Sequence, residues 1–460
     1  MRNKSKFGLG VQYLALFASL SVAPVFGEDA QPVSSPLTLA QAVETVLQHD
    51  FQLPRLAIEA KAFSAEGDAK NVMPDPVLFA AMQNIPTDTF DLDQEAMTQF
   101  RFGIKQMFPK GNSLKLSKAI AEHSSQEQHL VKQQQVLKLR QQTEMAWLEA
   151  WYWQKTGELI EQDRVFLTQM LDFMQSVYQL GGNNQSDLIG AELELIRLDE
   201  KVLEAARQYQ TYCHDLNTLA NTKFHQTALD SELVDLGYQS LPTETKLYAR
   251  LSKHPAFLIL DENVEQLGKK ISLSEQDFEP QWGLELSYGY RQDMPNGSDR
   301  ADLLSAGFSV QVPLFSRPQK SQAVRAVKYK QAAIENKRLE LFQKVRFELE
   351  NLAQQFQNTQ AQRQLYETQI LPTLGKQKDS AIQSYESDKG DFRVVTDLYL
   401  REQSTRIKLQ RLRVTEQVLI SKMNYWLKGL PKLPHVEQEA DIAMQTKSLM
   451  NSTEQLEMQP

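Results

Sequence analysis

The sequence predicts a mainly α-helical fold with a small portion of β-strand, in which one order of elements occurs twice. Three observations predict this fold class. Landmark residues recur at a nearly constant spacing, short segments alternate between apolar and polar residues, and each half ends in two very long helical patterns. A repeated unit of this length is too long for a solenoid repeat, so it predicts one protomer built from two similar halves.

The duplication shows in landmarks that keep the same order in both halves. The two histidines lie 205 residues apart, the two prolines 204 and the two tyrosines 207. These pairs are His49 with His254, Pro109 with Pro313, and Tyr178 with Tyr385. They place a first structural repeat at residues 28–225, a second repeat of the same order at 226–430, and an acidic, polar tail at 431–460.

Composition narrows the classes of function. The chain has 460 residues and a net charge of −8, which does not favour nucleic-acid binding. The single cysteine, Cys213, excludes an internal disulfide framework and a cysteine-based zinc site within one chain. The sequence contains no phosphate loop and no His-Glu-x-x-His pattern, and no histidine pair supports a metal at His214 or His225. We therefore expect no enzyme activity, no resident metal and no cofactor.

Residues 1–27 have the pattern of a secretory signal peptide. Three basic residues precede an apolar run from Val11 to Val22, and Val25–Gly27 follows at the place that a signal peptidase reads. The apolar run is shorter than the about 20 residues that a membrane-spanning helix needs. The sequence therefore predicts an exported protein, which is either soluble or crosses a membrane through β-strands.

Each half is expected to begin with a helix and to continue with two strands. Thr38 and Gln41 have the spacing of a capping box at the start of a helix over Leu37–Asn71. The corresponding helix of the second half spans Glu244–Asp277. The four strands are expected at Val77–Asn84, Thr98–Phe108, Gln281–Gln292 and Leu303–Pro313.

Apolar residues alternate with polar or small residues in three of these strands, most clearly where Trp282, Leu284 and Leu286 alternate with Gly283 and Glu285. This period places the apolar set on one face, as in strands of outer-membrane barrels. A half-buried sheet on a soluble core is the alternative. Four strands cannot close a barrel, and open edges in lipid leave backbone groups unsatisfied. Strands that span a membrane would therefore have to be pooled by two or more protomers.

The rest of each half consists of long helices. Trp147 and Trp151 lie one turn apart on the first of them, and we expect them to pack between helices. Helices of roughly 100 Å in an exported protein pack side by side as coiled coils. The long helices are expected at Asn112–Leu180, Asp187–Leu219, Gln319–Ser387 and Asp391–Lys428.

Together these features resemble the TolC-type outer-membrane efflux proteins, over the chain up to about Leu430. The resemblance rests on the leader, the duplicated order, the glycine–proline strand ends at Gly103 and Gly307, and the turns that begin at Tyr178 and Tyr385. It implies a homotrimer with one shared 12-strand barrel in the outer membrane of a Gram-negative bacterium and an α-helical tunnel in the periplasm. It also implies a periplasmic adaptor protein and an inner-membrane pump of the RND type as partners.

Within this family, the stretch Met73–Pro76 and the residues around Met97 and Met107 are most similar to the CusC- and CzcC-type members that serve heavy-metal exporters. This similarity implies metal cations as the cargo. Drug efflux and type I protein secretion through the same duct are alternatives, and so is an exported coiled-coil scaffold or adhesin without a pore.

The resemblance also implies where the tunnel narrows. The family carries acidic residues nine and twelve positions after the leading tyrosine of each turn, and each half keeps one of them, Asp187 and Asp397. Three protomers would form two rings of three carboxylates, which favour cations and can hold a pore shut. The alternative is two solvated residues near helix N-termini, where the helix dipole favours Asp.

The same turns are expected to contact the adaptor through apolar residues beside each bend. Packing of these residues within the helical wall is the alternative. The candidates are Leu188, Ile189, Val395 and Leu398.

Overall fold

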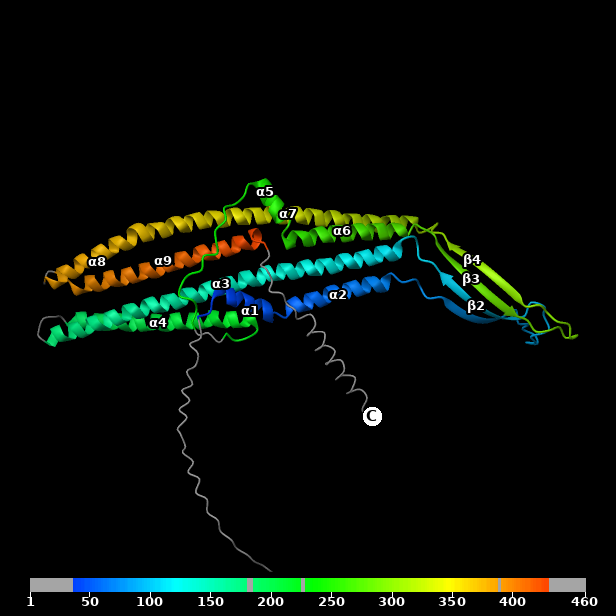
Figure 1. Ribbon diagram of the computed structural model, residues 1–460, viewed down its shortest axis with the longest axis horizontal. Coiled ribbons are helices and arrows are strands. Elements are labelled where there is room, and N and C mark those ends of the chain that lie inside the picture. Colours follow the sequence, from blue (N-terminus) through cyan, green and yellow to red (C-terminus); the bar gives the residue numbers. More distant parts are fainter. Residues whose placement is uncertain (1–35, 180–184, 225–227, 388–389, 430–460) are drawn as a thin grey trace, which may run out of the picture. The chain divides into compact units, whose positions relative to one another are not determined.

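The computed structural model describes residues 36–179, 185–224, 228–387 and 390–429, which belong to one compact unit. The expected signal peptide at 1–27 and the expected tail at 431–460 lie outside the described residues. The described residues form long helices and one four-stranded antiparallel sheet (Figure 1), which confirms the predicted mainly helical fold class.

Both halves of the chain have the same order of helices and strands. In the first half the elements are α1 (Leu39–His49), α2 (Gln52–Lys70), β1 (Val77–Gln83), β2 (Gln99–Met107), α3 (Ser113–Gln179) and α4 (Gln185–Ala220). In the second half they are α5 (Glu244–Leu251), α6 (Pro255–Gln276), β3 (Gln281–Tyr290), β4 (Leu303–Gln311), α7 (Arg317–Leu365), the π-helical turn η1 (Tyr366–Ile370), α8 (Leu371–Glu386) and α9 (Phe392–Leu427).

The helix expected at Leu37–Asn71 begins as predicted but is broken into α1 and α2. The capping box is present, because the Thr38 hydroxyl accepts from the Gln41 backbone and the Gln41 side chain accepts from the Thr38 backbone. The break occurs at Asp50, whose carboxylate accepts from the backbone N–H of Leu53 at 2.8 Å. Asp50 therefore supplies acceptors for the exposed N–H groups of a new helix.

The corresponding helix of the second half is broken at His254, so the expectation of one helix over Glu244–Asp277 was also wrong. The Nδ1 atom of His254 accepts from the Ala256 backbone at 3.2 Å, and Nε2 lies 3.1 Å from the Tyr425 carbonyl oxygen. Pro255 occupies the first position of α6, where its missing N–H costs nothing. His254 is buried, and this burial lowers its pKa to about 4.

The long helix expected at Gln319–Ser387 contains one irregular turn. Tyr366–Ile370 is π-helical and lies immediately before Leu371 and Pro372. A proline inside a helix has no N–H to donate, and its ring collides with the carbonyl group four residues earlier. A wider turn accommodates both effects, which explains why the helix continues through Pro372.

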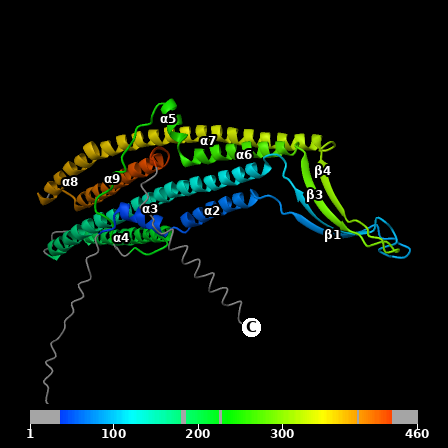
Figure 2. The same cartoon turned by 45° about the vertical axis from the view of Figure 1, so that its right-hand side comes forward.

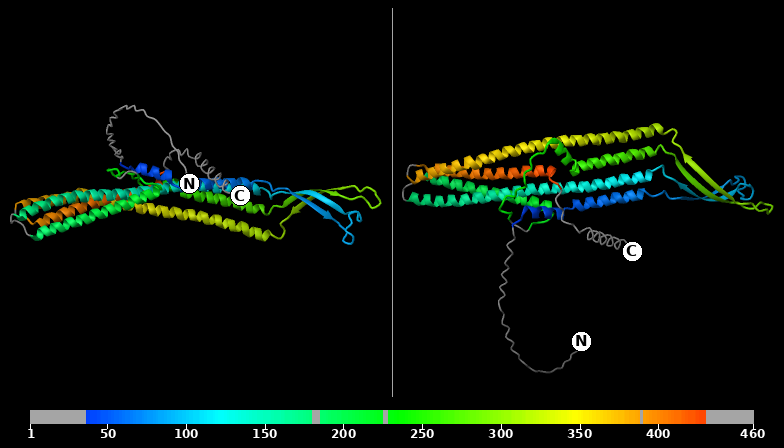
Figure 3. Two further views of the ribbon diagram at one scale, coloured as in Figure 1. Left: turned by 90° about the horizontal axis from the view of Figure 1, so that it is seen from below. Right: turned by 45° about the horizontal axis from the view of Figure 1, so that its top comes forward.

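The long helices lie side by side, as Figures 1 and 3 show, and α3 is central among them. It contacts α2 and α4 of its own half and α6 and α9 of the other half. Trp147 is fully buried, and the Trp151 indole donates to the Asp230 carbonyl oxygen at 3.0 Å. Phe166 stacks on Tyr399 of α9. These aromatic residues therefore pack between helices, as predicted.

The segment between the two halves is fixed to the helices by side-chain amides. The Gln154 side chain of α3 accepts from the Leu229 backbone N–H at 2.8 Å. Further along, the Gln417 side chain of α9 accepts from the Leu236 backbone N–H at 2.9 Å. The backbone N–H groups of Leu229 and Leu236 lie outside helices and strands, so these side chains supply the acceptors that they lack.

The sheet lies beyond one end of the helices and joins the two halves. Its order is β1-β2-β3-β4, so β2 of the first half pairs with β3 of the second. Figure 2 shows β3 and β4 beyond the ends of α6 and α7. Ile104 lies opposite Leu286, and Gly103 lies opposite Ser287. β1 and β4 are the edges and have no further partner strand within the described ranges. Among the residues that the structure describes, no helix is both long and apolar enough for a membrane span.

Candidate functional site

The sheet exposes its apolar face. Residues that lie opposite each other on neighbouring strands share a face of the sheet, which places Leu284, Leu286 and Phe308 together. These three residues are 47%, 49% and 67% exposed. No helix or loop of the described chain covers it, whereas a sheet on a soluble core buries its apolar side. The alternation predicted from the sequence is therefore present, with the apolar residues facing outward.

The opposite face carries polar and small residues with ordered contacts. The Arg101 guanidinium donates to the Glu285 carboxylate at 2.6 Å and to the Ser287 hydroxyl at 2.7 Å. It also lies 5.3 Å from the centre of the Phe79 ring. Phe79 extends across Gly103, where any Cβ would collide with the ring. The glycine that the sequence places on this face therefore makes room for a side chain of the next strand.

The other candidate region consists of the turns from α3 to α4 and from α8 to α9, at the opposite end of the helices from the sheet (Figure 1). Residues 180–184 and 388–389 of these turns are outside the described residues. Asp391 precedes α9, and its carboxylate accepts from the Arg393 backbone N–H at 2.8 Å. This contact is a side-chain N-cap.

Asp187 lies in the first turn of α4, and its side chain is 20% exposed. Its Oδ1 atom is 3.5 Å from Nε of Arg393 in α9, which also lies 3.7 Å from Asp391. Oδ1 is buried and has no hydrogen-bond partner among the described residues. The contact is thus an ion pair without hydrogen-bond geometry, and it connects the turn of one half to that of the other.

Asp397 has a different environment. Its side chain is 56% exposed, and it pairs with Arg401 at 2.9 Å, one turn along the same helix. An exposed pair of this kind contributes little to stability. The two carboxylates that the sequence singled out therefore have separate cationic partners. One connects two helices, and the other lies on the surface of α9.

The four apolar candidates at the turns are buried to different degrees. Val395 and Leu398 are 1% and 3% exposed. In this chain they are therefore packed within the helical wall, which was the alternative to adaptor contact. Leu188 packs against a small apolar cluster that includes Phe392. Ile189 alone among the four is largely exposed, at 55%. Val394, which the sequence reasoning missed, is 50% exposed at the second turn.

Sequence reasoning also missed a buried polar network between α3, α8 and α9. Asp163 and Gln403 are 3% and 2% exposed, and Oδ2 of Asp163 and both amide atoms of Gln403 have no hydrogen-bond partner in the described part of the chain. Burial raises the pKa of the Asp163 carboxyl. No pattern marked these residues, because they lie in helices already rich in Glu and Gln.

Glu402 of the same network is held by two cations. Its carboxylate lies 2.5 Å from Lys378 of α8 and 2.5 Å from Arg406 one turn further along α9. Burial alone would raise the pKa of Glu402, but the hydrogen bond from Lys378 and the charge of Arg406 lower it overall. Glu402 is therefore charged beside Asp163, whose charged form burial disfavours.

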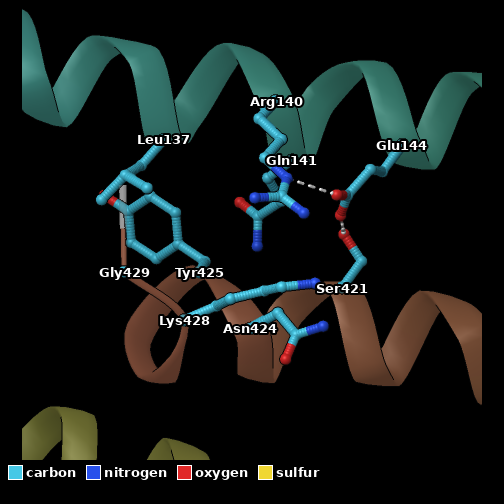
Figure 4. A pocket seen from close by; sticks show the side chains of 9 residues that line it. All are labelled: Leu137, Arg140, Gln141, Glu144, Ser421, Asn424, Tyr425, Lys428 and Gly429. Carbon is cyan, nitrogen blue, oxygen red and sulfur yellow. Dashed lines mark hydrogen bonds and ion pairs between the residues drawn. The ribbon is translucent and has the colours of Figure 1, made fainter. Parts of the chain in front are cut away.

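A small pocket lies between α3 and the end of α9, and hydrogen bonds bind its buried carboxylate (Figure 4). Glu144 is 3% exposed and accepts from Nε of Arg140 at 2.8 Å and from the Ser421 hydroxyl at 2.5 Å. The Asn424 amide donates instead to the Leu236 carbonyl oxygen. These bonds satisfy the buried carboxylate and attach α9 to α3, which is a structural role.

Metal ligands do not converge in the described ranges, where no group of three or more His, Cys, Asp or Glu side chains could hold an ion. The methionines are also dispersed. Met82 lies on the exposed apolar face of the sheet, and Met107 lies over Gly283 on the polar face. Met82 and Met107 therefore lie on opposite faces of the sheet and could not bind one metal ion together.

No family model and no curated protein matches the sequence. Solved structures do match the fold. The CusC structure, described as showing changes that accompany folding and transmembrane channel formation, is 13% identical, with 85% of this chain and 92% of that chain covered and a TM-score of 0.70. The outer-membrane channel OprN is 15% identical, covering 86% and 91%, with a TM-score of 0.69. The MtrE channel of Neisseria gonorrhoeae is 13% identical, covering 86% and 90%, with a TM-score of 0.68. The described chain therefore has the fold of the TolC-type outer-membrane channels.

Proposed function

We propose that this chain is one protomer of an outer-membrane exit duct in a tripartite efflux system, and that it is not an enzyme. The exposed apolar face of the sheet carries this proposal. Leaving apolar surface in water costs about 25 cal/mol per Å². A bilayer removes this cost, provided that the open edges β1 and β4 find partner strands.

A homotrimer satisfies these edges. In it, β4 of one copy pairs with β1 of the next, and three sheets of four strands close into a 12-strand barrel. The similarity in fold to OprN and MtrE, which are described as outer-membrane channels, supports this arrangement. The signal peptide at 1–27 directs export, and the repeats at 28–225 and 226–430 form the duct wall. The acidic tail at 431–460 comes after the second repeat in the sequence.

The helical turns form the periplasmic end of the duct. Three copies of Asp187 and Asp397 supply carboxylates at its narrowest part, where they favour cations. The ion pair between Asp187 and Arg393 joins the two turns, so that breaking it should ease their separation. The ion pair between Lys378 of α8 and Glu402 of α9 provides a second connection further along these helices.

The turns also contact the periplasmic adaptor protein, which couples the duct to an inner-membrane pump of the RND type. Of the predicted contact residues, Ile189 is exposed and makes the contact directly. Leu188 packs against the apolar cluster beside the turn, and Val395 and Leu398 are buried. Exposed Val394 extends the same apolar surface to the second turn.

Metal cations are the cargo that the sequence suggests. Drugs and proteins of type I secretion are the alternatives. In each case the inner-membrane pump is expected to choose which cargo enters the duct. Growth of a deletion strain on graded copper, zinc, cobalt and silver tests the metal proposal, and unchanged growth on all four contradicts it.

The duct proposal is tested by fractionating cells that produce the full chain. We expect the mature protein in the outer membrane, as an SDS-resistant trimer that dissociates on heating. Purified trimers in planar bilayers should give single-channel conductance. Recovery only as a soluble periplasmic protein would contradict the duct and favour a coiled-coil scaffold or adhesin.

The role of the turn carboxylates is tested by Asp397→Ala and Asp187→Ala. Each removes three charges from the proposed constriction, so we expect higher conductance at low voltage and weaker block by divalent cations. Asp187→Ala should have the larger effect on opening, because it also breaks the pair with Arg393. Asp215→Ala, at an exposed site towards the other end of α4, is the control with the same charge change. Traces identical to those of the control would remove these residues from the gate.

A further inference from the structure

The polar face of the sheet carries an uneven set of charges. Arg101 and Lys105 of β2 and Glu285 of β3 are its charged residues within the four strands. The positions of β1 and β4 that share this face hold Phe79, Ser305 and other uncharged residues. Two positive charges and one negative charge leave a net charge of +1 on this face of each chain. We call these three residues the basic strip.

The pairing within the basic strip leaves one cation without a partner. Glu285 lies directly opposite Lys105 in the ladder. Its carboxylate is nevertheless bound by Arg101, which reaches along β3 past Ser287 and is held there by the Ser287 hydroxyl and by Phe79. Lys105 has no ion-pair partner among the described residues. The excess charge of the strip is therefore the ammonium group of Lys105.

We propose that the basic strip lines the lumen of the duct and makes the part walled by the sheet favour anions. This inference rests on the proposed function, because closure of three sheets with their apolar faces in lipid turns the polar faces inward. Three chains then place three uncompensated ammonium groups around one narrow, water-filled space. Rings of Lys and Arg attract anions into a pore and repel cations.

The cargo class that fits this wall is a small anionic solute, such as one that bears a carboxylate or phosphate group. Bare metal cations gain nothing from it, so this inference and the metal cargo suggested by the sequence make opposite predictions. The helical turns differ, because Asp187 and Asp397 favour cations there. The duct would thus have two segments of opposite preference in series, and a mutation in the sheet should change the preference of the sheet segment alone.

The experiment measures the chloride-to-potassium permeability ratio of trimers in planar bilayers under a tenfold gradient of KCl. Lys105→Gln removes the excess charge without disturbing an ion pair, so the ratio should fall by about twofold or more. Glu285→Gln adds a net positive charge at the same level, so the ratio should rise. Lys246→Gln, on the exposed surface of α5, makes the same charge change away from the sheet and should leave the ratio unchanged.

The outcomes separate this inference from the proposed function. Migration of each variant as a heat-modifiable trimer shows that it has folded. If both Lys105→Gln and the Lys246→Gln control conduct with the same permeability ratio, the basic strip does not set the anion preference. The duct proposal would be unaffected by that result. If the wild-type trimer does not conduct at all, the duct itself fails, and the inference fails with it.

Discussion

The two halves of the chain have the same order of elements, yet they fix their long helices in different ways. In the first half α3 runs unbroken for 67 residues. The corresponding path in the second half is divided into α7, a π-helical turn and α8. An irregular turn of this kind often marks a place where a helix can change its path. The first half therefore has one continuous helix where the second half has an irregular turn beside a proline.

The paired landmarks show the same difference. His49 is exposed, and its ring is 2.9 Å from the carbonyl oxygen of Thr45 in the preceding turn of α1. His254, the histidine of the second half, is buried between α6 and α9 and caps α6, as Asp50 caps α2 in the first half. The two histidines therefore differ both in their position at the helix break and in the helices that surround them.

The largest expected difference between the halves is in acid stability. An unfolded His binds a proton below pH 6.5, whereas buried His254 does so only below about pH 4. Between these values the unfolded state holds more protons, so the stability of the fold decreases as the pH falls. The loss should reach about 3 kcal/mol at pH 4. His254→Asn keeps an N-cap acceptor for α6 and should remove this loss.

The measurement is the unfolding midpoint of the purified trimer between pH 4 and pH 7, with His49→Asn as the matched variant from the first half. Carboxyl groups titrate in the same range, so the difference between each variant and the wild type is the quantity that isolates the histidine. Equal pH dependence in both variants would show that burial of His254 does not control acid stability.

The next effect concerns the buried contact between the halves at Asp163. Burial raises its pKa in the folded state, so folding disfavours the charged form. The stability that the protonated carboxyl provides is complete below the ordinary value of 3.8 and is lost as the pH rises through the folded pKa. Asp163→Asn stays neutral and should therefore be more stable than the wild type at pH 7.

Thermal unfolding at pH 7 and at pH 3.5 checks this prediction, and the advantage of Asp163→Asn should disappear at the lower value. Asp172→Asn, at an exposed position on the same helix, should match the wild type at both values. A less stable Asp163→Asn variant at pH 7 would mean that the carboxylate is charged and well paired in the folded protein.

The smallest effect compares ion pairs on the two long helices. Glu367 in the π-helical turn accepts from Arg363 at 2.7 Å and from Arg413 of α9 at 2.8 Å, with its side chain 25% exposed. Among the described residues, Glu158 of α3 forms an ion pair only with Lys155, accepts a weak hydrogen bond from Gln154 at 3.4 Å, and is 43% exposed. Glu367→Gln should cost about 1 kcal/mol, and Glu158→Gln about 0.3 kcal/mol.

Denaturant unfolding in low salt and in 1 M salt tests this difference. Salt at 1 M screens exposed charges beyond about 3 Å, so the small effect of Glu158→Gln should vanish while part of the Glu367→Gln effect remains. Equal costs for both variants would show that the network at the π-helical turn gives no special support to α9.

The sequence was sufficient for the fold class, for the positions of the strands within two residues at each end, and for the packing role of Trp147. Local rules suffice for these features, because period-2 alternation, the Thr38 capping box and long proline-poor stretches each act over a few residues. The same alternation predicts that the apolar face of the sheet is exposed, because no other segment of the chain is free to cover it. The recurrence of His49 and His254 likewise predicted the shared order of elements.

The surroundings of His254 and the partner of Asp187 became known only from the tertiary structure. They depend on atoms supplied by segments far away in the chain, the Tyr425 carbonyl oxygen beside His254 and the Arg393 side chain beside Asp187. A sequence pattern specifies which faces of an element are apolar, but not which neighbour meets them. The charges on the polar face of the sheet were readable from the sequence, whereas their pairing required the strand register.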